Sequence, residues 1–146
     1  VGTLDGANIE IMKEVGQENI YIFGLNAEEV QNKKQSGYQP RDIVKQNLEL
    51  KEVLSMVQKG FFSNSHQDLF QPILENLLDH GDPYMVLADF QAFCDIQNEI
   101  GQAYLDPDTW VRKSITNVSR MGAFSSDRSI KEYAKEIWNI PLNSEK

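Results

Sequence analysis

Three residues with chemically useful side chains, Asp5, Asn8 and Glu10, lie close together near the beginning of the chain. They follow a short apolar run and an Asp-Gly break, at which a strand would give way to a helix. Ligands of α/β proteins bind at such points, where a strand ends and the next helix begins. A helix cap followed by a solvated face explains the same residues, and spacing alone favours that structural interpretation. A calcium loop is excluded, because its alternating acidic ligands and closing glutamate are absent.

Other residues that could carry chemistry lack the partners that it would need. His66 and His80 lie in different segments, with no second ligand one helical turn away and no neighbouring cysteine, so no metal site is predicted. Cys94 lies within a helical pattern and is expected to be a small core residue. The run Ser125–Arg128 could present hydroxyls and backbone N–H groups to a phosphate, but Ser126 acting as a plain N-cap explains it better. The chain contains neither a Gly-x-Ser-x-Gly nucleophile elbow nor a P-loop.

The composition is ordinary for a soluble globular protein of 146 residues, with 40% hydrophobic and 25% charged residues. The net charge of −8 argues against nucleic acid or an anionic membrane as a partner, since both select clustered Lys and Arg. A neutral or phosphorylated small substrate stays open. The single cysteine, the missing signal-peptide pattern and the lack of an apolar run of about 18 residues predict a cytoplasmic protein without a membrane segment.

The first part of the chain predicts a β-α-β unit. Val1–Leu4 is interpreted as the end of a buried strand, and Asp5 as the N-cap of a helix over Gly6–Val15 that ends at Gly16. Asn19–Gly24 is the clearest strand, because its continuous apolar run is typical of a strand covered on both faces in a parallel sheet. Strand, helix and strand in this order form the repeat of a doubly wound α/β fold.

The rest of the chain predicts helices. Their positions follow from breakers, caps and apolar residues at helical spacing. The expected segments are Asn26–Ser36, Pro40–Gln46, Leu50–Val57, Asp68–Leu78, Asp89–Tyr104, Asp106–Gly122 and Ser126–Pro141. The residues expected to act as N-caps are Asn26, with Glu29 completing a capping box, and Asp68, Asp89, Asp106 and Ser126.

Some of the predicted elements have apolar faces or strand edges that other parts of the protein must bury or pair. In the helix that follows Asp106, the residues expected to face inward are Trp110, Val111, Ile115 and Val118. The two strand pieces have edges that a native fold would cover or pair. Because Val1 lies inside an expected strand, we expect the chain to be a piece of a longer molecule.

The chain resembles the C-terminal end of glycogen (α-glucan) phosphorylases in an ordered series of blocks. Gly2–Glu10 resembles the family's Gly-Thr-x-Asp-Gly-Ala-Asn-x-Glu block. The blocks that follow in collinear order are Ile22–Gly24, Gly60–Ser63, Asp68–Phe70, Ala88–Phe90, Trp110, Phe124–Arg128 and Tyr133–Trp138. Any one block is weak, but the ordered set covers essentially the whole chain.

The resemblance implies an α/β fold, the C-terminal part of a Rossmann-like GT-B domain, mostly helical with two or three short strands. Residues 1–146 would form the C-terminal portion of the cofactor-binding domain, incomplete at its N-terminal edge. The parent would release α-D-glucose 1-phosphate from α-1,4-glucans with inorganic phosphate, with retained configuration, as a homodimer. Its pyridoxal phosphate, held by a lysine as a Schiff base, would act through its phosphate group.

No catalytic or cofactor-binding residue of the family can be assigned to a position of this chain. In the family, the cofactor lysine and the basic residues that hold the substrate phosphate precede the block that begins at Gly2, so the chain alone is expected to be inactive. Lys13 and Lys33 are surface helix lysines by pattern and are not the Schiff-base lysine. Asp5 and Asn8 are expected to support the cofactor indirectly, by fixing the turn that adjoins its segment.

Two other functions stay open at this point. A non-catalytic helical module that docks on a partner would also carry the partly bare apolar face that the resemblance implies for the last helix, Ser126–Trp138. Another GT-B transferase, using a nucleotide sugar, is disfavoured by the ordered blocks. A reading frame that continues upstream of Val1 into a Gly-rich lysine segment would favour the enzyme, whereas a start signal there would favour the module.

Overall fold

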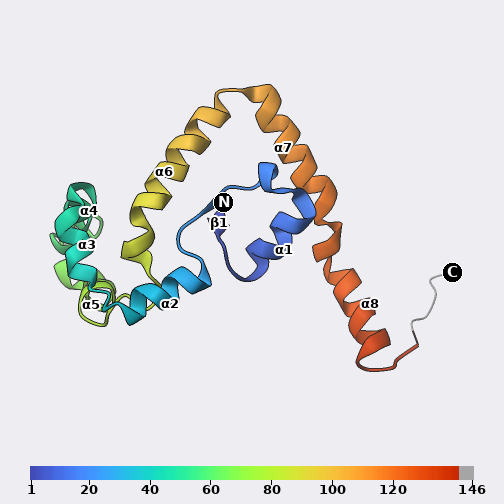
Figure 1. Cartoon of the computed structure of the whole chain (residues 1–146), viewed down its shortest axis with the longest axis horizontal. Helices are drawn as coiled ribbons and strands as arrows, with labels where there is room; N and C mark the ends of the chain where they lie inside the picture. The colour runs from blue at the N-terminus through green and yellow to red at the C-terminus, as the bar shows by residue number, and fades with distance from the viewer. Residues whose placement is uncertain (142–146) are drawn as a thin grey trace. The chain divides into compact units, whose positions relative to one another are not determined.

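The computed structural model describes residues 1–141 and is mostly helical. Its elements in order, with η marking short 3-10 helices, are β1 (Gly2–Thr3), α1 (Gly6–Val15), η1 (Gln17–Asn19), β2 (Ile22–Phe23), α2 (Ala27–Gln35), α3 (Pro40–Gln46), α4 (Leu48–Gln58), η2 (Gln67–Phe70), α5 (Gln71–Leu78), α6 (Val86–Tyr104), α7 (Pro107–Arg120), η3 (Met121–Phe124) and α8 (Ser126–Glu136) (Figure 1). The chain divides into two compact units. The first contains Val1–Asp5 and Ile22–Gly101, and the second contains Gly6–Tyr21 and the chain from Gln102 onward.

The first unit contains a two-stranded parallel sheet, which confirms the predicted order of strand, helix and strand. β1 pairs with β2, and Thr3 lies opposite Phe23. The strand predicted over Asn19–Gly24 is wrong at its beginning, because η1 extends to Asn19. Both strands are only two residues long, so the sheet pairs them over just two positions.

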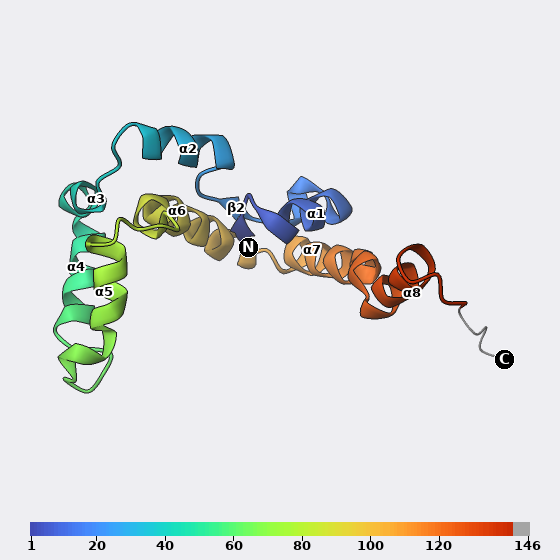
Figure 2. The same ribbon diagram turned by 90° about the horizontal axis from the view of Figure 1, so that it is seen from below.

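Helices α3, α4 and α5 of the first unit pack around a leucine core. Leu50, Leu54 and Leu74 are buried together with Leu87 of α6. Figure 2 shows α4 and α5 running side by side, and the two helices are in contact. Leu50 and Leu54 belong to the apolar pattern that predicted α4. Burial of a leucine side chain contributes about 1.5–3 kcal/mol, so this cluster is a main source of stability in the unit.

Two predicted helix starts are confirmed in detail. Asn26 Oδ1 accepts a hydrogen bond from Glu29 N–H (3.0 Å), and Glu29 Oε2 accepts one from Asn26 N–H (2.8 Å), which completes the capping box of α2. Asp106 Oδ1 accepts from Thr109 N–H (3.2 Å), with Pro107 at the first position of α7. Both motifs lie within one helical turn, so the sequence pattern alone locates them.

Three other predicted caps are wrong, each because a different residue sets the helix start. Asp68 lies inside η2, and α5 begins only after η2 ends. Ser125, not Ser126, occupies the N-cap position of α8, and its side chain makes no capping hydrogen bond. Asp89 lies in the first turn of α6, whose beginning is fixed by Asp82.

Asp82 is the buried anchor of the turn before α6. Its carboxylate accepts hydrogen bonds from Val86 N–H (2.9 Å), Leu87 N–H (2.8 Å) and the Tyr38 hydroxyl (2.8 Å), and the residue has no exposed surface. Asp82 and Met85 both have positive φ, 50° and 58°, a conformation that side chains disfavour. The three hydrogen bonds offset this cost and join the turn to the segment that follows α2.

In the second unit, the apolar side of α7 does not face inward. Val111, Ile115 and Val118 are 51%, 62% and 76% exposed, so their predicted burial is wrong. Trp110 is half-buried and meets Tyr104 edge to face, with ring centroids 5.1 Å apart. Helix α7 instead packs on α1 and η1 through polar side chains. The prediction failed because the helical pattern shows which face is apolar but not what covers that face.

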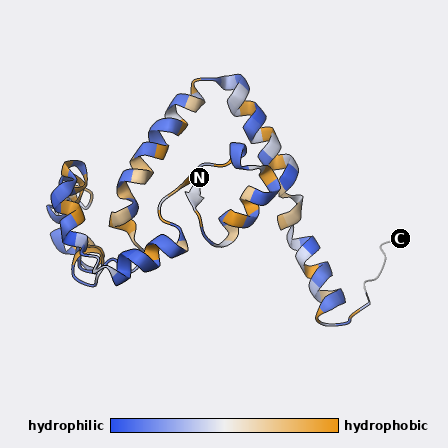
Figure 3. Cartoon of the chain, viewed as in Figure 1, coloured by the Kyte–Doolittle hydropathy of each residue, from blue (hydrophilic) through white to orange (hydrophobic). Residues whose placement is uncertain are grey.

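Helix α8 also exposes its apolar side. Ala134 is its only buried residue within the described chain. Side chains that are about half exposed or more follow along the helix and just beyond it: Ile130, Tyr133, Ile137 and Trp138. Figure 3 shows apolar residues recurring along both α7 and α8. This confirms the bare face expected of the last helix. No helix within residues 1–141 has the length and apolar character needed to cross a membrane.

We expect Asp82→Ala to destabilise the protein by about 2–4 kcal/mol, because it leaves the buried Leu87 N–H, the partly buried Val86 N–H and the Tyr38 hydroxyl without their acceptor. Tyr38→Phe removes one of the three hydrogen bonds and should cost about 1 kcal/mol. Urea unfolding followed by circular dichroism measures both. Asp95→Ala, at an exposed position of α6, is the control and should change the free energy of unfolding by less than about 0.5 kcal/mol. An Asp82→Ala loss no larger than the control would contradict the anchoring role.

Candidate functional site

The carboxyl ends of β1 and β2 lie at the same edge of the sheet, because the two strands are parallel. This is the edge at which α/β proteins place their ligands. The chain leaves β1 through Leu4 and Asp5, and it leaves β2 through Gly24 and Leu25. We refer to these four residues as the strand-end site.

Asp5 closes a tight turn at the end of β1 and does not cap α1. Its backbone N–H donates to Thr3 O (2.9 Å), and its Oδ1 accepts from the Thr3 hydroxyl (3.0 Å). No hydrogen bond within residues 1–141 joins the Asp5 carboxylate to a backbone N–H of α1, so the predicted cap is wrong. The turn therefore holds itself together locally, while the carboxylate stays exposed.

Asp89 of α6 contacts the end of β2. Its Oδ1 accepts a hydrogen bond from Leu25 N–H (2.9 Å), and its Oδ2 lies 2.5 Å from the position that a Cβ on Gly24 would occupy. Gly24 also has a φ of +82°. A side chain at position 24 is therefore disfavoured twice, by the backbone conformation and by the Asp89 carboxylate, which would have to move. Two blocks of the phosphorylase resemblance, Ile22–Gly24 and Ala88–Phe90, meet at this contact.

Partial burial sets the electrostatics of this contact. Loss of hydration raises the pKa of Asp89, with a further increase from the Asp82 carboxylate, while the Leu25 N–H opposes the change. Burial and the hydrogen bond to Asp82 also raise the pKa of Tyr38 beyond its ordinary range. Asp89 has a raised pKa and lies at the sheet edge where α/β proteins place ligands, which makes it a candidate functional residue. Sequence reasoning missed Asp89, because only its place in the Ala88–Phe90 block set it apart from an ordinary cap.

Asn8 and Glu10 lie on α1, in the second unit. Asn8 is half-buried, and no hydrogen bond within residues 1–141 involves its side chain. Glu10 is exposed and lines a cavity of about 460 Å³ together with Lys13 and Arg128. The lining contains charges of both signs, so it selects neither anions nor cations. The supporting role of Asn8 stays a prediction.

Three side chains of α7 bind the carboxyl end of α1 and η1. The donor–acceptor pairs are Arg120 Nη1 with Glu14 O (3.1 Å) and Val15 O (3.3 Å), Asn117 Nδ2 with Asn19 O (2.8 Å), and Lys113 Nζ with Glu18 O. The last carbonyls of a helix lack intrahelical partners and carry the negative end of its dipole, so cationic donors stabilise them. We call Lys113, Asn117 and Arg120 the carbonyl clamp.

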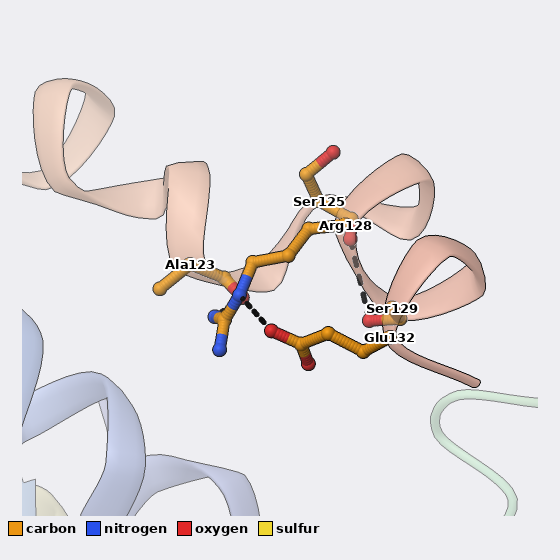
Figure 4. Close-up of polar contacts among 5 residues, drawn as sticks. All are labelled: Ala123, Ser125, Arg128, Ser129 and Glu132. Atoms are coloured by element: carbon orange, nitrogen blue, oxygen red, sulfur yellow. Dashed lines mark hydrogen bonds and ion pairs between the residues drawn. The ribbon is translucent and has the colours of Figure 1, made fainter. Parts of the chain in front are cut away.

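Figure 4 shows that Arg128 is engaged by its neighbours. Its Nε donates to Glu132 Oε1 (2.7 Å), and its Nη1 donates to Ala123 O. Ser129 Oγ donates to Ser125 O (3.3 Å) in the same turn. The guanidinium therefore ties η3 to α8, so Arg128 has a structural role, although Ser126 is not the N-cap that the sequence predicted.

The described residues do not fit a pyridoxal phosphate site. The cofactor needs a lysine enclosed by the protein, and no lysine within residues 1–141 is buried. Lys13 is exposed, and Lys33 Nζ lies 5.8 Å from the ring centroid of Tyr38. In the same part of the chain, no three His, Cys, Asp or Glu side chains gather where they could hold a metal ion. Cys94, expected in the core, is only half-buried.

Sequence comparison places the chain in a family. The carbohydrate phosphorylase family profile matches residues 1–140. A glycogen phosphorylase of Synechocystis sp. is 52% identical over 140 residues, which make up 96% of this chain and 16% of that protein. The corresponding protein of Chlamydia pneumoniae is 41% identical over 144 residues, 99% of this chain and 17% of its own. The brain form of human glycogen phosphorylase is 42% identical over 140 residues, which make up 96% of this chain and 16% of the human protein.

The chain belongs to the carbohydrate phosphorylase family. The three relatives named above are glycogen phosphorylases, which confirms the resemblance drawn from the ordered blocks. The chain spans about 16% of the length of the curated relatives that it matches.

We expect the stability of Asp89→Asn relative to the wild type to rise with pH. The raised pKa means that the folded state holds the Asp89 proton more tightly than the unfolded state, whose carboxyl titrates near 3.8. The wild type therefore loses stability as pH rises from 3.8 through the folded-state pKa, and the neutral amide does not. Thermal unfolding of both proteins at pH 3.5 to 7 measures the difference. A difference that is constant over this range, or that falls, would contradict the assignment.

We expect Arg120→Ala to destabilise the protein by about 1 kcal/mol, because two carbonyls at the end of α1 lose their charged donor and the guanidinium is largely exposed to water. Arg112→Ala, an exposed arginine of the same helix, is the matched control and should change the free energy of unfolding by less than about 0.5 kcal/mol. Urea unfolding distinguishes the two variants. Equal effects would show that the clamp adds nothing beyond the charge of α7.

Proposed function

We propose that this chain is part of a glycogen phosphorylase that uses inorganic phosphate to release α-D-glucose 1-phosphate from α-1,4-glucans. The observation that carries the proposal is the family match over residues 1–140, together with glycogen phosphorylases that are 41–52% identical over 96–99% of the chain. The parent would use pyridoxal phosphate, held by a lysine outside residues 1–141, and would act as a cytoplasmic homodimer.

Within such an enzyme, this chain supplies support for the reacting groups. We assign residues 1–146 to the C-terminal portion of the cofactor-binding domain of a GT-B parent. The family's cofactor segment would enter β1 from its amino end, and the pairing of Gly2 with Ile22 would then fix where that segment stops. Asp5 would hold the turn that follows, through its two contacts with Thr3.

The chain alone is expected to be inactive. Its described lysines are exposed or half-buried, and the Arg128 guanidinium already bonds Glu132 and Ala123 O. Phosphorolysis needs several cationic groups directed at one phosphate, and these residues provide no such cluster. The missing groups would come from the remainder of the parent.

The exposed apolar side chains of α7 and α8 fit the same proposal. Ile115, Val118 and Ile137 are each more than 60% exposed, although the helical spacing of apolar residues along α7 and α8 is that of a buried face. Aliphatic side chains arranged this way gain stability when a partner surface removes them from water. The remainder of a phosphorylase parent would supply this surface. The same face favours a non-catalytic docking module as the second candidate, which would need no catalytic remainder.

A chimera tests the proposed function. Residues 1–140 would replace the matched segment of the Synechocystis glycogen phosphorylase, and we expect phosphate-dependent release of glucose 1-phosphate from glycogen, as in that parent. The 146-residue chain alone should show neither phosphorolysis nor pyridoxal phosphate absorbance. Asp5→Ala in the chimera should lower activity or cofactor retention. A folded, cofactor-loaded chimera without activity would contradict the function, and unchanged activity and melting for Asp5→Ala would contradict the role of Asp5.

A further inference from the structure

We propose that Asp89 is a positioning residue, which holds the carboxyl end of β2 and, through the β1–β2 pair, sets the Thr3–Asp5 turn. The structural linkage stands on the contacts of the first unit alone. Its consequence for catalysis rests on the proposed function.

The linkage begins at the end of β2. Leu25 N–H lies just beyond the last paired residue of the strand, and it finds its acceptor on Asp89, 64 positions away, at 2.9 Å. The second carboxylate oxygen lies against Gly24, in the space that a Cβ would need. Asp89 therefore holds the backbone at Gly24 and Leu25, the two residues through which the chain leaves β2.

A second contact makes the attachment of α6 to β2 rigid. Phe93, one helical turn after Asp89, meets Phe23 edge to face with ring centroids 5.3 Å apart. Such aromatic pairs contribute beyond the area that they bury. One polar and one aromatic contact therefore hold β2 against α6 at two points, and a strand held at two points cannot rotate freely.

The sheet passes this constraint to β1. Thr3 lies directly opposite Phe23, and Gly2 lies opposite Ile22. Each strand is only two residues long, so the pair has few ladder hydrogen bonds with which to resist a shift of β2. Within the described residues, β2 is the only strand that pairs with β1, so the position of β1 in the sheet depends on β2.

Thr3 connects β1 to the turn. Its carbonyl accepts the Asp5 N–H (2.9 Å), and its hydroxyl donates to the Asp5 carboxylate (3.0 Å). Since Thr3 is both a strand residue and the partner of Asp5, the register of the strand sets the position of the Asp5 carboxylate. The contacts thus run without a gap from Asp89 to Asp5 inside one unit.

Residue-resolved hydrogen–deuterium exchange on the 146-residue chain tests the linkage. We expect Asp89→Ala to accelerate exchange at Leu25 N–H by about five- to thirtyfold, the factor for loss of its hydrogen bond, and to accelerate exchange at Asp5 N–H as well. Asp89→Asn keeps a carbonyl oxygen for Leu25 N–H and should restore the wild-type exchange rates at both amides. Asp95→Ala, also on α6 and exposed, should leave both unchanged.

Two results would overturn the proposal. Faster exchange at Leu25 with unchanged exchange at Asp5 would show that Asp89 holds β2 without affecting the turn. Unchanged exchange at both amides would show that Asp89 holds neither. If Asp89→Ala fails to fold, Asp89→Glu replaces it, because the longer side chain keeps the charge but moves the carboxylate away from Leu25 N–H. It should accelerate exchange at the same two amides, and failure to do so would also overturn the proposal.

The Synechocystis chimera separates this proposal from the proposed function. If the chimera is active, Asp89→Ala should lower kcat about tenfold or more with little change in the KM for phosphate, since small displacements near reacting groups cost rate. Asp89→Asn should recover most of kcat. An active chimera with unchanged kcat in Asp89→Ala would overturn the catalytic consequence. A chimera without activity would contradict the proposed function, while the exchange result would still decide the linkage.

Discussion

The pair formed by β1 and β2 is too short to hold itself together, so the sheet edge depends on contacts with α6. Two residues on each strand provide little ladder bonding, and isolated two-stranded pairs are marginal in water. Support comes from α6, through Asp89 at Leu25 and Phe93 at Phe23. Helix α6 is in turn fixed at its start by the buried Asp82. The position of the sheet edge therefore depends on α6 and on the turn that precedes it.

Local motifs allowed the sequence to predict most helices, and contacts between distant segments explain what it missed. The capping box at Asn26 and the cap at Asp106 lie within one helical turn, so residue types at fixed spacing identify them. The bond between Asp89 and Leu25 has no such local signal. Asp82 was missed for a similar reason, because its partner Tyr38 is 44 positions away and its positive φ is not expected of aspartate before a proline.

Helix α7 shows a different limit of sequence patterns. Its apolar stripe is real, but a stripe specifies only that some surface must cover it. In the described chain, Val111, Ile115 and Val118 of this stripe are exposed. Polar side chains, those of the carbonyl clamp, make the contacts with α1 and η1 instead. These three residues lie at i, i+4 and i+7 and so share one helical face, but a polar face of this kind is also typical of a solvated surface, so the sequence did not distinguish the two.

The crowding of Gly24 by Asp89 links two positions during evolution. A side chain at position 24 would meet the carboxylate at 2.5 Å, and the φ of +82° adds its own cost. A substitution at Gly24 therefore displaces the Asp89 carboxylate and strains the backbone, and only the first of these costs falls when position 89 carries a shorter side chain. The cost of a change at position 24 thus depends on the residue at position 89, so substitutions at the two positions are coupled although they lie 65 positions apart in the sequence.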